Sequence, residues 1–154
     1  MELLKKTGIF LILNFTALAI GGLFTGNGVA SDWYALANKA PWTPPGWVFG
    51  VAWTSIMITF AVYMAFLLSP NANTKKIKKL YLLQWMLNIL WNPFFFYAHN
   101  ALLGLVCITA LTVLIAYFFF NYLKQMRYKT LLLSPYLLWL LIATSLNLYF
   151  LVYN

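Results

Sequence analysis

Charged residues divide the chain into four long charge-free stretches, whose lengths predict membrane-spanning helices. The stretches cover residues 7–31, 40–74, 80–123 and 130–154. One span needs about 20 apolar residues, because about 30 Å of hydrocarbon must be crossed with all backbone polar groups bonded within the helix. The third stretch is long enough for two spans, with His99-Asn100 as the polar break between them. We therefore predict an all-α membrane protein, a bundle of five transmembrane helices near residues 7–25, 46–68, 80–98, 101–122 and 131–151.

The composition agrees with this prediction. Hydrophobic residues make up 64% of the chain and charged residues only 8%, against about 25% charged residues in an ordinary soluble domain. Too little sequence lies outside the predicted spans for a soluble domain, so residues 1–154 are expected to form one membrane domain. Lys5 and Lys6 precede the first apolar stretch without a clear small-residue cleavage pattern, so this stretch is expected to remain as an anchor.

The basic residues alternate along the predicted loops and thereby predict an orientation. Nine of them fall on one side of the predicted membrane and only Lys39 on the other. The positive-inside rule places the amino terminus and the loops 69–79 and 124–129 in the cytoplasm, with the carboxyl terminus outside a bacterial cell membrane. The net charge of +8 is concentrated beside the membrane, so we expect membrane lipid rather than nucleic acid as its partner.

One polar stripe runs along the predicted third span. Its residues are spaced i, i+4, i+7, i+8 and i+11, and they therefore share one helical face. An amide that faced lipid would have unpaired donors and acceptors, so the stripe should point into the bundle. There it either bonds to other helices or lines a cavity. The stripe consists of Gln84, Asn88, Trp91, Asn92 and Phe95.

A similar but sparser stripe follows the fifth span, where Trp139, Ala143 and Asn147 recur at intervals of four. The small Ala143 permits either close helix approach or space for a ligand. In the second span, Trp53 shares a face with Phe49.

The predicted loop 26–45 is too aromatic for a plain linker. It contains Tyr34, Trp42 and Pro44. Aromatic residues in such a loop often form an interfacial belt at the lipid headgroups. Pro44 and Pro45 are expected to set the start of the second span, because proline is tolerated only in the first turn of a helix.

These blocks resemble one family over nearly the whole chain: the translocator protein family (TspO/MBR), also called tryptophan-rich sensory proteins or peripheral-type benzodiazepine receptors. The resemblance rests on four blocks in order and at matching spacing. They are Trp33-Tyr34 with Pro41-Trp42-x-Pro44-Pro45, then Phe49 and Trp53, then Gln84-x-x-x-Asn88-x-x-Trp91, and finally Pro135-Tyr136-x-x-Trp139-x-x-x-Ala143-Thr144-x-x-Asn147.

The resemblance implies a membrane receptor or sensor that binds porphyrins such as protoporphyrin IX, or similar hydrophobic polycyclic molecules, in a pocket closed by the loop 26–45. Family members also bind sterols in animals, and synthetic ligands, and the resemblance leaves a homodimer open. The implied ligand-binding residues are Tyr34, Trp42, Pro44, Trp53, Asn88, Trp91, Asn92, Phe95, Trp139, Ala143 and Asn147.

Three departures from the family pattern narrow these expectations. Met57 stands where a tyrosine is frequent, which removes one hydroxyl from the implied pocket. No basic residue follows Tyr149 or Tyr153, so sterol binding through the animal motif is not expected. The third span also lacks small residues at spacing four, which often form a dimer seam.

Acid–base or metal chemistry finds few candidates in this sequence. The carboxylates Glu2 and Asp32 lie outside the spans, and His99 lies at a turn. We therefore expect no metal and no cofactor, and a binding function rather than an enzyme.

Two other functions remain open. Bacterial relatives resemble light-dependent porphyrin-degrading enzymes in which two pocket tryptophans matter, and Trp53 and Trp139 occupy those positions here. A tetrapyrrole or sterol transporter is the third alternative, although no inverted repeat and no charged residue deep in a span supports it.

Overall fold

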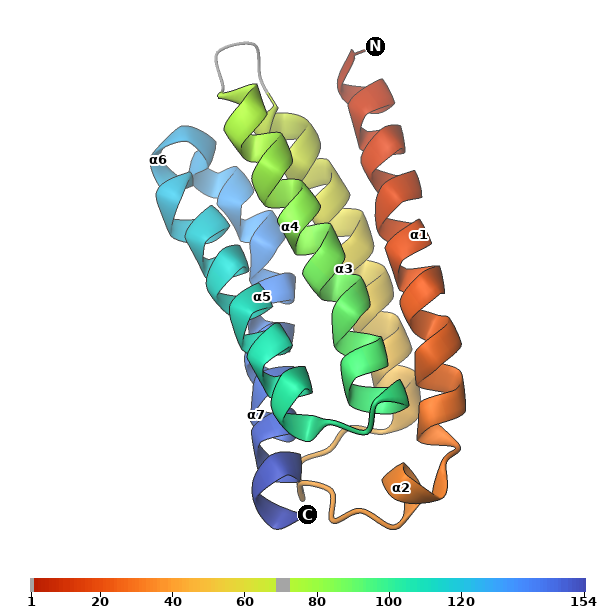
Figure 1. Cartoon of the computed structure of the whole chain (residues 1–154). Coiled ribbons are helices and arrows are strands. Elements are labelled where there is room, and N and C mark those ends of the chain that lie inside the picture. The colour runs from red at the N-terminus through yellow and green to blue at the C-terminus, as the bar shows by residue number, and fades with distance from the viewer. Residues whose placement is uncertain (1, 69–72) are drawn as a thin grey trace.

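The computed structural model describes residues 2–68 and 73–154, and throughout these residues it contains helices and no strand (Figure 1). Five helices are long: α1 Glu2–Val29, α3 Gly46–Leu67, α4 Thr74–Asn92, α5 Ala101–Asn121 and α7 Ser134–Tyr153. The short elements between them are α2 Asp32–Ala35, the π-helix η1 Pro93–Tyr97, α6 Leu123–Met126 and the 3₁₀-helix η2 Arg127–Leu133. The predicted all-helical class is confirmed.

Four helical segments in the described part of the chain are long and apolar enough to cross a membrane, one fewer than predicted. They are Glu2–Val29, Gly46–Leu67, Ala101–Asn121 and Leu123–Tyr153. Helix α4 is the missing one, because it begins with a cluster of four lysines at positions 75, 76, 78 and 79. The length and composition of these segments make the chain an integral membrane protein.

The helix bounds differ from the predicted spans mainly at α1 and α4. Helix α1 continues to Val29, because the buried Gly28 packs on Phe96 and holds its last turn in place. Helix α4 begins at Thr74, within the predicted loop 69–79, of which residues 69–72 lie outside the described part. The chain turns at His99, which has a left-handed φ of 50°, and Asn100 then caps α5 by accepting a hydrogen bond from the amide of Leu103 at 2.9 Å.

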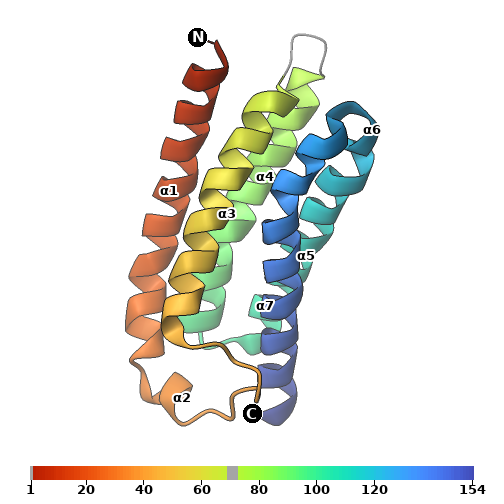
Figure 2. The same ribbon diagram turned by 180° about the vertical axis from the view of Figure 1, so that it is seen from behind.

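The long helices run antiparallel to their neighbours in the chain and form a closed ring in the order α1, α3, α7, α5, α4 (Figures 1 and 2). The two termini lie at opposite ends of the bundle. The amino terminus, the start of α4 and α6 share one end, which carries nine of the ten basic residues. We call this the basic end, and the opposite end, beneath α2, the lid end.

Helix α3 is buried along only half of its length. All eight of its buried residues lie between Ile56 and Leu67, towards the basic end, where Phe60 and Tyr63 pack against Phe118 of α5. No residue between Gly46 and Ser55 is fully buried. The bundle is therefore closely packed at the basic end and more open beside α3 at the lid end.

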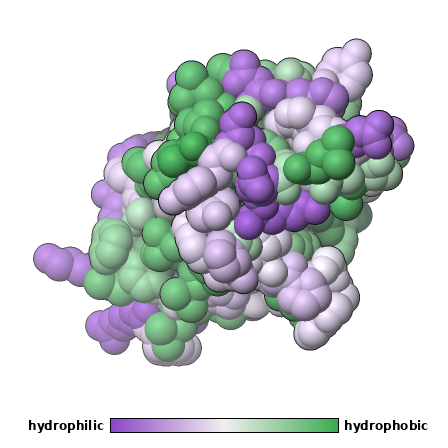
Figure 3. Space-filling view, turned by 90° about the horizontal axis from the view of Figure 1, so that it is seen from below, coloured by the Kyte–Doolittle hydropathy of each residue, from purple (hydrophilic) through white to green (hydrophobic). Residues whose placement is uncertain are grey.

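The segment from Ser31 to Pro45 crosses the lid end, and we call it the lid (Figure 2). Seen from this end, the surface mixes hydrophilic, intermediate and hydrophobic residues (Figure 3). The side chain of Asn154 pairs with the backbone of Asn38, accepting from its N–H at 2.7 Å and donating to its carbonyl at 3.2 Å. Asn38 also donates from its own amide to the carbonyl of Tyr153 at 3.1 Å. These three bonds tie the lid to the end of α7.

Candidate ligand-binding site

The polar stripe of α4 points into the bundle, as predicted. Gln84, Asn88 and Asn92 are all less than 9% exposed. The side-chain amides of Gln84 and Asn88 both donate to the hydroxyl of Tyr136, at 2.7 and 2.9 Å. Tyr136 lies on α7, so these amides join α4 to α7 across the interior of the bundle. Of the two alternatives, bonding to another helix is therefore the one observed for this pair.

Trp91 connects this interior to the lid end. Its indole N–H donates to the side-chain oxygen of Asn147 at 3.2 Å, and the amide of Asn147 donates to the carbonyl of Ala143 at 3.1 Å. The Trp91 ring also stacks on Phe95, with 5.7 Å between ring centroids and an angle of 12°. The predicted residues Trp91, Phe95, Ala143 and Asn147 therefore form one continuous group that joins α4 and η1 to α7.

Aromatic pairs join α3 to α7 at the same level of the bundle. Phe49 meets Trp139 edge to face at 5.1 Å between centroids, and Trp53 meets Tyr136 in the same way at 6.1 Å. Because Phe49 and Trp53 are one turn apart, the two pairs form successive rungs between the helices. Trp53 of α3 and Trp139 of α7 thus belong to neighbouring pairs on the two facing helices.

The indole N–H of Trp139 is buried and has no hydrogen-bond partner among the described residues. The whole side chain is 6% exposed. An unpaired buried donor costs about 1–3 kcal/mol. The N–H is therefore a free donor inside the bundle, one turn from the small side chain of Ala143.

The lid contributes a second aromatic cluster. The ring of Tyr34 contacts Phe95, Phe96 and Phe150, the last stacked at 6.1 Å. The ammonium of Lys39 lies 4.6 Å from the centre of the Tyr34 ring on the lid. Burial raises the pKa of Tyr34 above its usual value of 10, so its hydroxyl stays neutral and can donate a hydrogen bond.

Three predicted residues lie apart from this group. Asn92 faces α1, where its side-chain oxygen accepts a hydrogen bond from the hydroxyl of Thr25 at 2.6 Å. Trp42 is 53% exposed and lies on the outer face of α7, donating to the hydroxyl of Ser145 at 3.1 Å. Pro44 is half-buried beside the start of α3. The family resemblance had assigned these three residues to the same ligand-binding site as the residues around Trp139.

The predicted set omits several residues that the structure places in contact with it. Tyr136 is the acceptor for two stripe amides, and Phe49 packs on Trp139. Phe150 contacts Tyr34, and its signal in the sequence was its position three residues after Asn147, on the same helical face. Tyr136 is part of the fourth motif block that resembles the family, but it was not among the predicted ligand-binding residues.

His99 lies at the lid end and contacts an aromatic ring. Its imidazole stacks on Trp33, with 4.7 Å between centroids and an angle of 16°. Within residues 2–68 and 73–154, no group of three His, Cys, Asp or Glu side chains is arranged to hold a metal ion. The chemistry on offer at the site is therefore aromatic stacking and amide or indole hydrogen bonding.

These features define a helical membrane protein with an interior of tryptophan and asparagine side chains beneath an aromatic lid. The chain belongs to the TspO/MBR family, whose sequence model matches residues 9–153. This match confirms the resemblance seen in the motifs.

Curated relatives come from all three domains of life. The chain is 36% identical to the tryptophan-rich protein TspO of Archaeoglobus fulgidus, over 96% of this chain and 95% of the relative. It is 30% identical to the tryptophan-rich sensory protein of Cereibacter sphaeroides, over 89% and 87% of the two chains. It is also 30% identical to the human translocator protein, over 88% and 85%.

Proposed function

We propose that this chain is a membrane receptor that binds porphyrins such as protoporphyrin IX between α3, α4 and α7 in the lid half of the bundle. The unpaired N–H of Trp139 is the observation that carries the proposal. A ligand acceptor at this position would remove the cost of the buried donor, about 1–3 kcal/mol. The Cereibacter sphaeroides relative, named a tryptophan-rich sensory protein, supports a signalling role rather than a structural one.

The open half of α3 supports a ligand at this level. Phe49 and Trp53 are half-buried, whereas Phe60 and Tyr63, further along the same helix, have no exposed surface. A small outward movement of the first half of α3 would separate Phe49 from Trp139 without disturbing the closely packed basic end. The space gained would lie between two aromatic rings.

The residues around this space suit a large flat ligand. Trp53, Trp91 and Trp139 offer ring faces for stacking, and Asn147 offers an amide at the edge. Trp91 and Asn147 already bond to each other, so a ligand edge that replaced either partner would meet a polar group in position. Tyr34 would then cover the ligand from the lid.

We further propose that α4 crosses the membrane together with η1, which makes five spans. Residues 80–97 follow the last lysine and continue without a charge through the π-helix. At 1.5 Å per residue they extend about 27 Å, close to the ~30 Å of hydrocarbon. Five spans leave the termini on opposite sides, with the basic end in the cytoplasm by the positive-inside rule.

Absorbance titration of the purified protein with protoporphyrin IX tests the binding site. Ala143→Leu fills the proposed space, and we expect it to weaken binding at least tenfold, whereas Ala19→Leu on the exposed face of α1 should leave binding unchanged. Trp139→Phe keeps an aromatic ring, although a smaller one, and removes the N–H, so the dissociation constant should rise about 2–10-fold for one lost hydrogen bond. Equal affinities for Ala143→Leu and the unaltered protein would rule out this site.

Light-dependent porphyrin degradation is the second candidate, favoured by the adjacent α3–α7 rungs that hold Trp53 and Trp139. Illumination of the porphyrin-loaded protein should then give a product spectrum that both Trp53→Phe and Trp139→Phe abolish. A spectrum no different from that of illuminated free porphyrin would leave the receptor function alone.

A further inference from the structure

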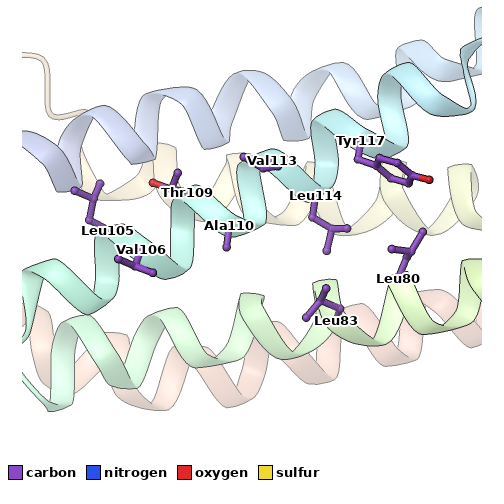
Figure 4. Close-up of a pocket in the computed structure, with 9 residues that line it drawn as sticks. All are labelled: Leu80, Leu83, Leu105, Val106, Thr109, Ala110, Val113, Leu114 and Tyr117. Carbon is purple, nitrogen blue, oxygen red and sulfur yellow. The ribbon is translucent and has the colours of Figure 1, made fainter.

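The outer face between α4 and α5 carries an apolar groove of about 730 Å³ (Figure 4). Leu80 and Leu83 of α4 form one wall, and α5 forms the other with residues that include Val106, Ala110 and Tyr117. The only hydroxyl groups in the lining belong to Thr109 and Tyr117. The groove lies on the outside of the bundle, whereas the proposed porphyrin site lies inside it.

The length of the groove matches one leaflet of a bilayer. On α5 it extends from Leu105 to Tyr117, or about 18 Å at 1.5 Å per residue. Half of the hydrocarbon layer measures about 15 Å. One acyl chain lying along α5 would therefore fill most of the groove, with its headgroup at the end near the basic loops.

A lysine stands at that end of the groove. Lys76, Leu80 and Leu83 are spaced i, i+4 and i+7, so Lys76 continues the α4 wall. Its ammonium lies 5.3 Å from the centre of the Tyr117 ring, which lines the groove. The groove thus leads from apolar walls to a cation and a phenol hydroxyl.

The chain itself supplies no anion for this lysine cluster. Its two carboxylate side chains are Glu2, which lies 3.4 Å from Lys6, and Asp32, which lies in α2 at the lid end. A second copy of the chain, related by an axis along the membrane normal, would bring the same lysines to the same end and repel the first. Charge complementarity therefore favours an anionic occupant.

We propose that this groove is a specific site for one anionic phospholipid, with an acyl chain between α4 and α5 and the phosphate at Lys76 and Tyr117. The groove walls and the surrounding lipid tails are equally apolar, so the acyl chain gains little free energy by moving from the bulk lipid into the groove. Selectivity between phospholipids must then come from the headgroup charge, which one lysine near the surface favours about fivefold.

Native mass spectrometry of the full chain, in micelles with equal phosphatidylglycerol and phosphatidylcholine of matched acyl chains, tests the proposal. We expect one retained lipid, with phosphatidylglycerol preferred about fivefold. Lys76→Gln should bring the ratio close to one. Lys78→Gln removes the same charge from another face of the same helix turn and should retain the preference.

A groove-filling variant separates the acyl-chain part from the headgroup part. Ala110→Phe should reduce retention of both lipids, while Ala19→Phe on the exposed face of α1 should not. Unchanged porphyrin binding would show that Ala110→Phe is folded. If no variant binds porphyrin, an unchanged thermal unfolding midpoint would show the same. The proposal would be overturned if Lys76→Gln and Lys78→Gln lost the phosphatidylglycerol preference equally, or if Ala110→Phe retained as much lipid as the unaltered protein. A lipid-free dimer that forms through this face would also overturn it.

Discussion

Two adjacent glycines in α1 should respond oppositely to the same substitution. Gly21 is buried against the side chain of Asn92, whereas a Cβ at Gly22 would meet no atom within 4 Å. A Cβ at Gly21 would lie 2.5 Å from the Asn92 amide nitrogen, about 0.9 Å inside the 3.4 Å at which ordinary contact begins. The Asn92 side chain is held by hydrogen bonds to Thr25 and to the carbonyl of Asn88, so it cannot move aside without breaking them.

The expected magnitudes follow from these contacts. Alanine is favoured over glycine in a helix interior by about 0.8–1.0 kcal/mol, and Gly22→Ala should gain this amount. In Gly21→Ala the same gain is opposed by about 1–3 kcal/mol of overpacking and by up to 1–3 kcal/mol for an unpaired buried amide. We therefore expect Gly21→Ala to lower the free energy of unfolding by about 1–2 kcal/mol.

Thermal unfolding in detergent measures both changes through the single cysteine of the chain. Cys107 is buried, so a thiol-reactive dye reports its exposure on unfolding. At about 2–4 °C per kcal/mol for a chain of this size, Gly21→Ala should unfold about 2–8 °C lower and Gly22→Ala about 2–4 °C higher. Asn92→Ala should remove most of the extra cost of Gly21→Ala when the two are combined. Shifts of the same sign at both glycines would refute this account of the α1–α4 contact.

Two further changes test the lid and the interior. Asn38→Ala removes one of the three bonds to the end of α7, the 3.1 Å bond from the side-chain amide of Asn38 to the carbonyl of Tyr153. We expect a freer lid, measured as at least threefold faster porphyrin dissociation in stopped flow. Tyr136→Phe leaves the amides of Gln84 and Asn88 without their acceptor, so the chain should lose about 2–6 kcal/mol of stability and unfold at a lower temperature in the dye assay.

Each of these changes has a matched control. Asn27→Ala removes an exposed amide in the last turn of α1, and Tyr128→Phe removes an exposed hydroxyl. Neither control should change dissociation or stability measurably. Dissociation as slow in Asn38→Ala as in Asn27→Ala would show that the lid does not limit ligand release. An unfolding temperature in Tyr136→Phe equal to that of Tyr128→Phe would show that the amides find other partners.

The features that were predictable from the sequence depend on membrane physics. Lipid offers no hydrogen bonds, so charge-free lengths indicate where helices lie, and an amide within them must turn inward. Gln84, Asn88 and Asn92 are buried for this reason. Helix α4 is not apolar enough along its length to count as a span by itself, because its lysines lie inside the helix, where the sequence pattern had placed a loop.

The partners of these side chains were not predictable. The stripe on α4 indicates which face of that helix turns inward, but α1, α3 and α5 are mostly apolar on all sides, so the sequence does not say which neighbour each amide meets. Asn92 shares a stripe with Asn88, yet it bonds to Thr25 of α1 while Asn88 bonds to Tyr136 of α7. That division depends on how the helices cross, which requires the packed bundle.

The half-buried course of α3 affects how binding should be measured. Residues 46–55 belong to a candidate span and none of them is fully buried, so a ligand that entered the proposed site between α3 and α7 would come from the bilayer. A polycyclic molecule partitions into lipid because its apolar surface leaves water there. Occupancy then follows the mole fraction of ligand in the membrane. In vesicles the total ligand needed for half-saturation should therefore rise with the amount of lipid, even at constant protein.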